Sequence, residues 1–400
     1  MNTKNQAKQI KYCDGNTAAA YGVLLCKPDV IAVYPVTPQT QVAEKLVQFK
    51  TEGLLDADIV EVEGETSAIG VIYGAAGAGA RVFTATSGAG LEFMHDGYVM
   101  AGMARIPIVM VNASRELNPP WVVAAGEQDI MNKLDSGWIH LHVENCQEIL
   151  DSIIMAYRLA EDIDIQNAIT INYDGYYLSH LSEPVEIPSQ EAVDKFLPPL
   201  SPNFPRLDKR PIAFGVSFIP PEEVAEYRHR QFAAFERVKT KIEEIDKEFE
   251  CNFGRSYGGQ IEQYQMEDAE IALVTLGSCS GTAKVVVDRK REEGIKIGLV
   301  KVRLFRPFPK EKLVEALSGQ KAVGVIDRNV CFGWNCGHTF MELKAALYGS
   351  NNIPLLNFIG GLGGGDITIK HIERAIDTVL LAAQGKHSRE VIWLPLEQIT

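Results

Sequence analysis

The sequence lacks the features that mark several protein classes. Its seven cysteines are odd in number and include no C-x-x-C pair, so neither a disulfide framework nor an iron–sulfur or zinc signature is indicated. No apolar run approaches the roughly twenty residues of a membrane span, and the first residues lack the apolar segment of a signal peptide. The formal net charge of −13 argues against non-specific nucleic-acid binding, since the sequence offers no basic stripe to replace phosphate counterions. We therefore expect a cytoplasmic protein that binds neither nucleic acid nor membrane.

The rest of the composition is that of a globular chain. Of its 400 residues, 46% are hydrophobic and 23% are charged, which suggests two or three domains with large cores. Strand-like and helix-like segments alternate from Asn16 to about Ser182 and again from Ile271 onward. This alternation is typical of α/β domains built on doubly wound parallel sheets.

A proline-dense stretch separates the two alternating regions. Residues 183–221 predict an extended chain over the surface, and a long polar helix to about Phe249 follows. The segment 303–309 is interpreted as a turn after a second-domain strand. We expect a first α/β domain at 1–185, an extended linker with a helix at 186–260, and a second α/β domain at 261–400.

Two stretches place polar side chains where an apolar strand ends, and open α/β sheets keep their active sites at such strand ends. Tyr34-Pro35-Val36-Thr37-Pro38 ends the first strand, and its second proline can open a helix. Val62-Glu63-Gly64-Glu65 ends the second strand and puts Glu65 at the start of an Ala/Gly-rich helix. Thr37 and Glu65 are therefore candidate site residues, although a helix N-terminus favours a carboxylate for stability alone.

Two later strands end in similar ways. Residues 84–91 follow the third strand with glycines that permit close backbone approach, a pattern that a plain tight turn would also give. Arg115 follows the fourth strand, and a guanidinium beside a threonine hydroxyl suits a small carboxylate. The alternative for Arg115 is a surface ion pair with Glu116.

Histidines and cysteines give no metal site by their spacing. His140 and His142 alternate on one face of a predicted strand, as structural histidines do. Cys331, Cys336 and His338 lie close in sequence, but C-x4-C-x-H is not an established ligand spacing. We interpret both groups as structural and predict no metal on this chain.

Together these stretches resemble the alpha subunit of the multisubunit 2-oxoacid:ferredoxin oxidoreductases, in the pyruvate branch of that family. The resemblance runs nearly from end to end. Its motifs are Tyr34-Pro35-Val36-Thr37-Pro38, Glu63-Gly64-Glu65, Thr86-Ser87-Gly88-Ala89-Gly90, Gln128-Asp129, Asp135-Ser136-Gly137-Trp138-Ile139, Asn172-Tyr173-Asp174-Gly175-Tyr176, Ser179-His180, Phe253-Gly254-Arg255-Ser256-Tyr257-Gly258-Gly259, Arg306-Pro307-Phe308-Pro309 and Phe358-Ile359-Gly360-Gly361-Leu362-Gly363-Gly364.

The resemblance implies a first domain that binds the pyrimidine half of thiamine diphosphate and a second like the C-terminal domain of transketolase. Glu65 is implied to hydrogen-bond the aminopyrimidine ring, so that the ring's exocyclic nitrogen can take the proton from the thiazolium carbon. Thr37 and Arg115 are implied to hold the substrate carboxylate. The residues implied to contact the cofactor are Glu65, Pro35, Ser87 and Gly88.

Part of a complete thiamine enzyme is missing from the sequence. It has no convincing Gly-Asp-Gly…Asn segment for the diphosphate, since Gly365-Asp366-Ile367 is too isolated, and it has no cluster cysteines. The resemblance therefore implies that the diphosphate site with Mg²⁺ and the [4Fe-4S] clusters lie on partner subunits, which pass electrons to ferredoxin. We expect this chain alone to be inactive.

The substrate stays open between two small acids. Ala125-Gly126-Glu127 stands where pyruvate enzymes usually carry a histidine and an acidic residue. This difference weakens the inference that the substrate is pyruvate and makes oxalate an alternative substrate. Our hypothesis is oxidative decarboxylation of pyruvate or oxalate. The alternatives are the beta component of a lipoamide-linked 2-oxoacid dehydrogenase and a non-catalytic scaffold subunit.

Overall fold

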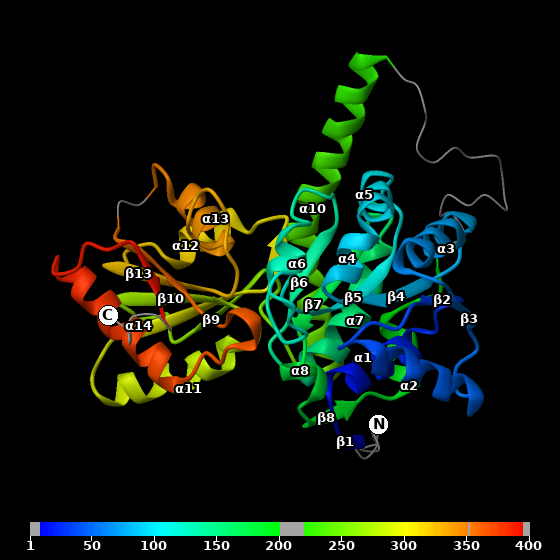
Figure 1. The fold of residues 1–400 in the computed structure, drawn as a ribbon, viewed down its shortest axis with the longest axis horizontal. Helices are drawn as coiled ribbons and strands as arrows, with labels where there is room; N and C mark the ends of the chain where they lie inside the picture. The colour runs from blue at the N-terminus through cyan, green and yellow to red at the C-terminus, as the bar shows by residue number, and fades with distance from the viewer. Residues whose placement is uncertain (1–8, 201–219, 351–352, 395–400) are drawn as a thin grey trace.

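The computed structural model describes residues 9–200, 220–350 and 353–394. Figure 1 shows two sheets side by side, with helix α10 (Pro221–Phe253) rising from the region between them. The predicted long helix after the proline-dense stretch is thus present. It begins at Pro221, where the missing proline N–H costs no hydrogen bond.

The first sheet has seven strands in the order β12-β6-β7-β5-β4-β2-β3. All neighbours are parallel except β12, which runs antiparallel to β6. The central strands β4, β5 and β7 are buried along their whole length, because helices cover both faces. The strand bounds are β2 (Val30–Val33), β3 (Asp58–Glu61), β4 (Val82–Thr86), β5 (Val109–Ser114), β6 (Ile139–His142), β7 (Ile169–Asp174) and β12 (Leu304–Arg306).

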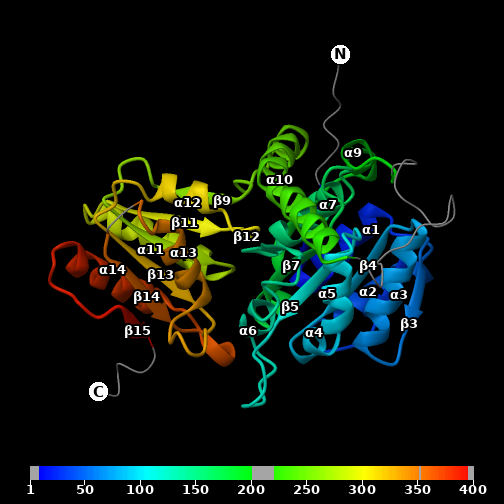
Figure 2. The same cartoon turned by 90° about the horizontal axis from the view of Figure 1, so that it is seen from above.

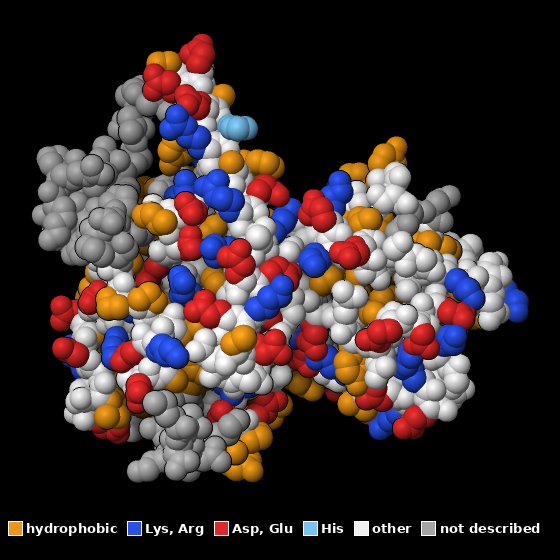
Figure 3. Space-filling view, turned by 180° about the vertical axis from the view of Figure 1, so that it is seen from behind, with side chains coloured by type: hydrophobic (Ala, Val, Ile, Leu, Met, Phe, Trp, Pro, Cys, Tyr) orange, Lys and Arg blue, Asp and Glu red, His pale blue; other side chains and the backbone are white. Residues whose placement is uncertain are grey.

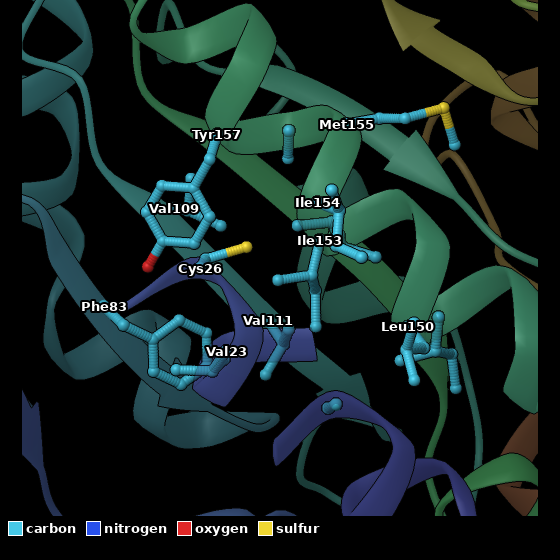
Figure 4. Close-up of a cluster of buried hydrophobic side chains, with 14 of the residues drawn as sticks. Val23, Cys26, Phe83, Val109, Val111, Leu150, Ile153, Ile154, Met155 and Tyr157 are labelled. Atoms are coloured by element: carbon cyan, nitrogen blue, oxygen red, sulfur yellow. The ribbon is translucent and has the colours of Figure 1, made fainter. Parts of the chain in front are cut away.

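Helices lie on both faces of this sheet, some below it and others above it in Figure 1. Below are α1 (Gly15–Cys26), α2 (Thr40–Thr51) and α7 (Cys146–Ala160), and above are α3 (Glu65–Ala78), α4 (Ala89–Phe93) and α5 (His95–Met103). Helices α1 and α7 pack closely, since a Cβ at Gly22 would lie 3.1 Å from Ile153 Cβ. Figure 4 shows Val23 and Cys26 of α1 beside Ile153 of α7 and Val111 of β5 in this core.

The second sheet has the order β15-β14-β13-β10-β11-β9, in which only β9 is antiparallel to its neighbour. Because β11 lies on one side of β10 and β13 on the other, the strand order reverses between β10 and β13. The bounds are β9 (Ile261–Tyr264), β10 (Ile271–Leu276), β11 (Ile297–Val302), β13 (Ala322–Asp327), β14 (Leu355–Ile359), β15 (Val391–Trp393), α11 (Cys279–Glu292), α12 (Lys310–Ala316), α13 (His338–Leu347) and α14 (Ile369–Ala383).

The prediction that 183–221 runs extended over the surface is wrong for residues 190–196, which form a helix, while the residues before them form an extended edge strand. Strand β8 (Glu183–Ile187) pairs antiparallel with β1 (Gln9–Cys13), and helix α9 (Gln190–Phe196) follows. The two strands form a ribbon of their own, in which Pro184 is tolerated because each strand is an edge. The Ser189 side chain caps α9 by accepting from Ala192 N. Residues 201–219 of the predicted stretch lie outside the described ranges.

The segment 303–309 is not only a turn, because its first part forms strand β12 on the edge of the first sheet (Figure 2). The chain leaving β11 crosses here between the domains. Arg303 is fully buried, and its Nε donates to Glu148 Oε1 of α7 at 2.9 Å. Lys301 Nζ of β11 contacts Glu148 Oε2 at 3.1 Å. These buried ion pairs join the two domains, and removing one partner would leave an uncompensated charge.

The surface carries charges of both signs. Figure 3 shows Lys and Arg side chains interspersed with Asp and Glu over both lobes of the face it presents. Helix α10 is the longest helix within the described ranges, and its first turns at 221–230 are exposed and charged. No helix of the described residues combines the length and the apolar character that crossing a bilayer requires.

Candidate active site

Glu65 is the first residue of α3, directly after the turn that follows β3. Its side chain is buried, at 8% exposure, and no described residue donates a hydrogen bond to its carboxylate. A Cβ at Gly90 would lie 2.5 Å from Glu65 Oε1, so the carboxylate lies against the start of α4. The interaction with the helix N-terminus favours this placement, and the carboxylate has no hydrogen-bond donor among the described residues.

Thr86, the last residue of β4, brings a second unpaired polar atom to the same place. Its Oγ1 is buried without a hydrogen-bond partner, and it lies 2.7 Å from the same Cβ position at Gly90. Buried polar side-chain atoms normally have partners. The Glu65 carboxylate and the unpaired Thr86 hydroxyl therefore come together at Gly90, where any side chain would contact both.

Arg115 follows β5 and reaches the turn that follows β2. Its Nη1 donates to Thr37 O at 2.8 Å, and its Nε is buried without a partner. The side chain lies across Gly88, where a Cβ would lie 2.3 Å from Nε; Gly88 also has a φ of +53°, which favours glycine. Arg115 forms no surface ion pair with Glu116, whose Oε2 accepts from Gly363 N instead.

The segment 87–90, which is the turn after β4 and the first two residues of α4, lies between the predicted residues, with Gly88 against Arg115 and Gly90 against Glu65. Thr37 and Pro35 are exposed in the adjacent turn, whose following helix begins at Thr40 rather than at Pro38 as predicted. Ser87 is buried, and its hydroxyl donates to Ala113 O. That hydroxyl is therefore already used within the fold.

Asp129 of α6 (Gln128–Met131) holds this site together, although sequence reasoning gave it no role beyond the Gln128-Asp129 motif. Its fully buried carboxylate accepts from Gly88 N at 3.0 Å, from Arg115 N at 3.2 Å and from the Ser114 hydroxyl. Burial raises the pKa of Asp129, and these hydrogen bonds oppose the rise. Asp129 thus fixes the backbone on which Gly88 and Arg115 sit.

Glu127, two residues earlier, is buried at the boundary with the second domain. Its Oε2 accepts from Asn329 Nδ2 at 3.1 Å. Burial raises the pKa of Glu127 to about 8; Arg328 opposes this rise, while the carboxylates of Asp174 and Asp327 add to it. Glu127 is therefore mostly protonated at neutral pH.

We expect Glu127→Gln to remove a pH dependence of stability. Between pH 4.5 and about 8 the folded chain holds a proton on Glu127 that the unfolded chain has lost, so wild-type stability falls as pH rises through this window. The loss is about 1.4 kcal/mol per pH unit for this single group. Melting of the purified complex at pH 5, 6.5 and 8 should show the variant gaining on the wild type as pH rises. A constant difference across the three values would contradict the expectation.

The histidines and cysteines singled out in the sequence have structural partners. His140 Nε2 lies 3.2 Å from Tyr98 OH, and burial lowers the pKa of His142 to about 3, so it is neutral. Cys331 N donates to Cys336 O at 2.7 Å, and His338 Nδ1 lies 2.8 Å from Asn329 Oδ1. Within the described ranges, no three His, Cys, Asp or Glu side chains are grouped so as to hold a metal ion.

Comparison with known families assigns both α/β regions of the chain. Residues 21–247 match the family described as "Pyruvate flavodoxin/ferredoxin oxidoreductase, thiamine diP-bdg". Residues 269–372 match "Pyruvate:ferredoxin oxidoreductase core domain II". The chain belongs to this family of 2-oxoacid oxidoreductases, and its first region is a thiamine diphosphate-binding domain.

Curated relatives place the chain among the alpha subunits of that family. It is 41% identical to the alpha subunit of an NADH-dependent phenylglyoxylate dehydrogenase from Aromatoleum evansii, over 97% of this chain and 95% of that one. The ketoisovalerate oxidoreductase subunit VorA of Pyrococcus horikoshii is 41% identical, over 97% and 98%. The pyruvate synthase subunit PorA of Methanothermobacter thermautotrophicus is also 41% identical, over 97% and 99%.

Solved structures confirm the predicted fold class. A 2-oxoglutarate:ferredoxin oxidoreductase from Magnetococcus marinus matches with a TM-score of 0.71 and 20% identity, over 94% of this chain and 66% of that one. A split-gene transketolase beta chain matches with a TM-score of 0.52 and 14% identity, over 92% and 97%. At these identities the likeness establishes the fold: a doubly wound thiamine diphosphate-type domain followed by a transketolase-like α/β domain.

Proposed function

We propose that this subunit supplies the carboxylate that activates thiamine diphosphate and the arginine that holds the substrate in a ferredoxin-linked 2-oxoacid oxidoreductase. One observation carries the proposal. Glu65 lies against Gly90 and Arg115 against Gly88, two glycines of the segment 87–90; Arg115 Nε is buried without a partner, and no described residue donates to the Glu65 carboxylate. A scaffold subunit would have no use for two such groups at strand ends.

The residues present fit the pyrimidine ring of the cofactor. Bound thiamine diphosphate supplies a thiazolium carbon that, once deprotonated, attacks a 2-oxo carbon. Glu65 would accept a hydrogen bond from the ring, and the unpaired Thr86 Oγ1 offers a second polar contact. Gly90 lets the two groups approach the start of α4, because any side chain there would contact both. Arg115 would orient the substrate carboxylate through its unpaired Nε.

We infer that the substrate is a 2-oxo monocarboxylate, with pyruvate as the first candidate and oxalate less favoured. Arg115 places one cationic side chain against Gly88. The described contacts of Gly88 and Gly90 include no second cationic side chain. Oxalate carries a second carboxylate, which would need a second cation. The buried Arg328 pairs through Nη1 with Asp174 at 2.6 Å, and its Nε lies against Gly361 rather than against Gly88 or Gly90.

The domain limits and partners follow the same proposal. Residues 1–185 would form the pyrimidine-binding domain, 186–260 the linker and 261–400 the transketolase C-terminal-like domain. The diphosphate end with Mg²⁺ and the [4Fe-4S] clusters would lie on other subunits, and ferredoxin would accept the electrons. The absence of a diphosphate segment from the sequence and the naming of the relatives as subunits support this division.

Assay of the purified complex tests the proposed function. Pyruvate, 2-oxoisovalerate, phenylglyoxylate, 2-oxoglutarate and oxalate would each be supplied with and without coenzyme A, using ferredoxin, NAD or lipoamide as acceptor. We expect turnover of at least one 2-oxo monocarboxylate with ferredoxin and none of oxalate. Lipoamide-dependent turnover would favour the dehydrogenase alternative, and a complex that holds no thiamine diphosphate would favour the scaffold.

Gly90→Ala tests the fit of the cofactor ring. The added methyl group would lie 2.5 Å from Glu65 Oε1 and 2.7 Å from Thr86 Oγ1, so both must move. We expect at least a tenfold loss of thiamine diphosphate affinity, measured by titration of the apo-complex, which corresponds to about 1.4 kcal/mol. Gly74→Ala in α3 is the matched control, because a Cβ there meets nothing within 4 Å. Equal affinity of the two variants would refute the proposed position of the ring.

A further inference from the structure

The second sheet has its own ligand crevice by topology, at the point where strand order reverses between β10 and β13. Ser278 lies there at the N-terminus of α11, and Arg328 directly follows β13. A hydroxyl, a guanidinium and a helix N-terminus are groups that bind anions. In many doubly wound domains such a crevice receives a free ligand.

In this protein a carboxylate of the first domain occupies the crevice. Asp174, the last residue of β7, places Oδ2 2.6 Å from Arg328 Nη1, and the Ser278 hydroxyl donates to the same oxygen. Asp174 is 2% exposed and Arg328 is 5% exposed. The remaining cavity measures about 10 Å³, which leaves no room for a second anion. Burial alone would lower the pKa of Arg328, but Asp174 and Glu127 raise it, so the guanidinium stays charged.

The chain next to Asp174 touches both parts of the substrate site. Gly175 N donates to Ser114 O at 2.8 Å, and Ser114 immediately precedes Arg115. A Cβ at Gly175 would lie 2.7 Å from Pro38 Cγ, next to Thr37. Any shift of the end of β7 would therefore move the turn that carries Thr37 and the strand end that carries Arg115.

A second connection runs through the residues after Arg328. Glu127 N donates to Arg328 O at 3.3 Å, and Val330 N donates to Gln128 Oε1 at 3.0 Å. The next residue, Asp129, holds the backbone of Gly88 and Arg115. Two sets of hydrogen bonds thus connect the second domain to the substrate site, and both begin at this crevice.

We propose that Asp174 is a built-in anion that fills the ligand crevice of the second domain and thereby positions Arg115 and the Thr37 turn for the substrate. We class three residues as positioning residues, because their hydrogen bonds and ion pair join them to one another and not to the segment 87–90: Asp174, Ser278 and Arg328. The inference rests on the proposed function for the identity of the substrate. It gives the second domain a role in substrate affinity.

Asp174→Ala in the complete complex tests this role by rescue with a small anion. We expect the KM for the 2-oxo acid to rise about tenfold or more, with a smaller change in kcat, because Arg115 loses its position. Formate should restore the KM, since the emptied crevice retains Arg328 and Ser278. Asp174→Asn should also raise the KM, but formate should not restore it, because the amide fills the space. Asp194→Ala, which removes an exposed partner of Lys27, is the control and should match the wild type.

Melting of the same complexes gives a readout that does not depend on activity. We expect formate to raise the melting temperature of Asp174→Ala and to leave Asp174→Asn and the wild type unchanged. A wild-type complex that oxidises no 2-oxo acid would refute the proposed function. The melting experiment would still test whether Asp174 fills the anion site formed by Arg328 and Ser278. An unchanged KM in Asp174→Ala, or a lowered melting temperature that formate does not raise, would overturn the inference. If Asp174→Ala does not assemble, a wild-type KM in Ser278→Ala would overturn it instead.

Discussion

Replacing Glu65 by glutamine is expected to abolish turnover of the 2-oxo acid while the complex stays assembled and loaded with cofactor. The amide has the same shape as the carboxylate, so the buried position at the start of α3 remains filled. It lacks the negative charge that would favour the proton-accepting form of the aminopyrimidine ring. General acid–base contributions of this kind are worth roughly 10²- to 10⁴-fold in rate. Stopped-flow reduction of ferredoxin or a viologen dye measures the loss.

Glu63→Gln is the matched control for this variant. Glu63 lies two residues before Glu65, but its side chain is exposed and accepts from Ser67 Oγ at 2.5 Å. We expect its activity to equal that of the wild type. Size-exclusion chromatography and a thiamine diphosphate assay would establish that both variants are assembled and loaded. Normal turnover by a loaded Glu65→Gln complex would sink the assignment of Glu65.

Replacing Arg115 by alanine is expected to raise the KM for the 2-oxo acid by about 10- to 100-fold. A hydrogen bond to a charged group contributes about 1.5–3 kcal/mol, and the variant removes the guanidinium that lies against Gly88. It also frees Thr37 O, which accepts from Arg115 Nη1. Arg115→Lys keeps the charge but loses the planar fork, so a smaller rise is expected. Initial-rate kinetics over a wide substrate range would give KM and kcat separately.

Arg230→Ala provides the comparison for Arg115. Arg230 is exposed on α10 and pairs only with Glu226 one turn away, so its loss should leave the kinetics unchanged. Because Arg115 is buried against Gly88, alanine also leaves a space there, and melting of the complex separates lost stability from lost affinity. An Arg115→Ala complex with a wild-type KM would mean that another group holds the carboxylate.

Much of the candidate site could be predicted from the sequence, because its residues follow strands that are recognisable locally. Thr37, Glu65 and Arg115 each come directly after an apolar run, and parallel strands bring such ends to one edge. The roles of Asp129 and Asp174 could not be predicted in this way. Asp129 depends on Gly88 and Asp174 on Arg328, partners that lie far along the chain. No local sequence pattern indicates these contacts.

The missed elements of the fold have a related cause. Strand β8 is short and contains Pro184, so its sequence favours irregular structure until β1 supplies its pairing partner. Strand β12 has only three residues, and it forms because β6 of the other domain offers a free edge. In both cases tertiary pairing decides the structure against the local pattern.

The most direct test of the central claim measures the reactivity of the cofactor in the assembled complex without any substrate. The exchange of the thiazolium C2 proton of bound thiamine diphosphate for deuterium can be followed by NMR after acid quenching. If Glu65 activates the ring, exchange in Glu65→Gln should be slower than in the wild type by roughly 10²-fold or more. Glu63→Gln should exchange at the wild-type rate. Equal rates in Glu65→Gln and the wild type, with cofactor bound in both, would contradict the claim that this chain supplies the activating carboxylate.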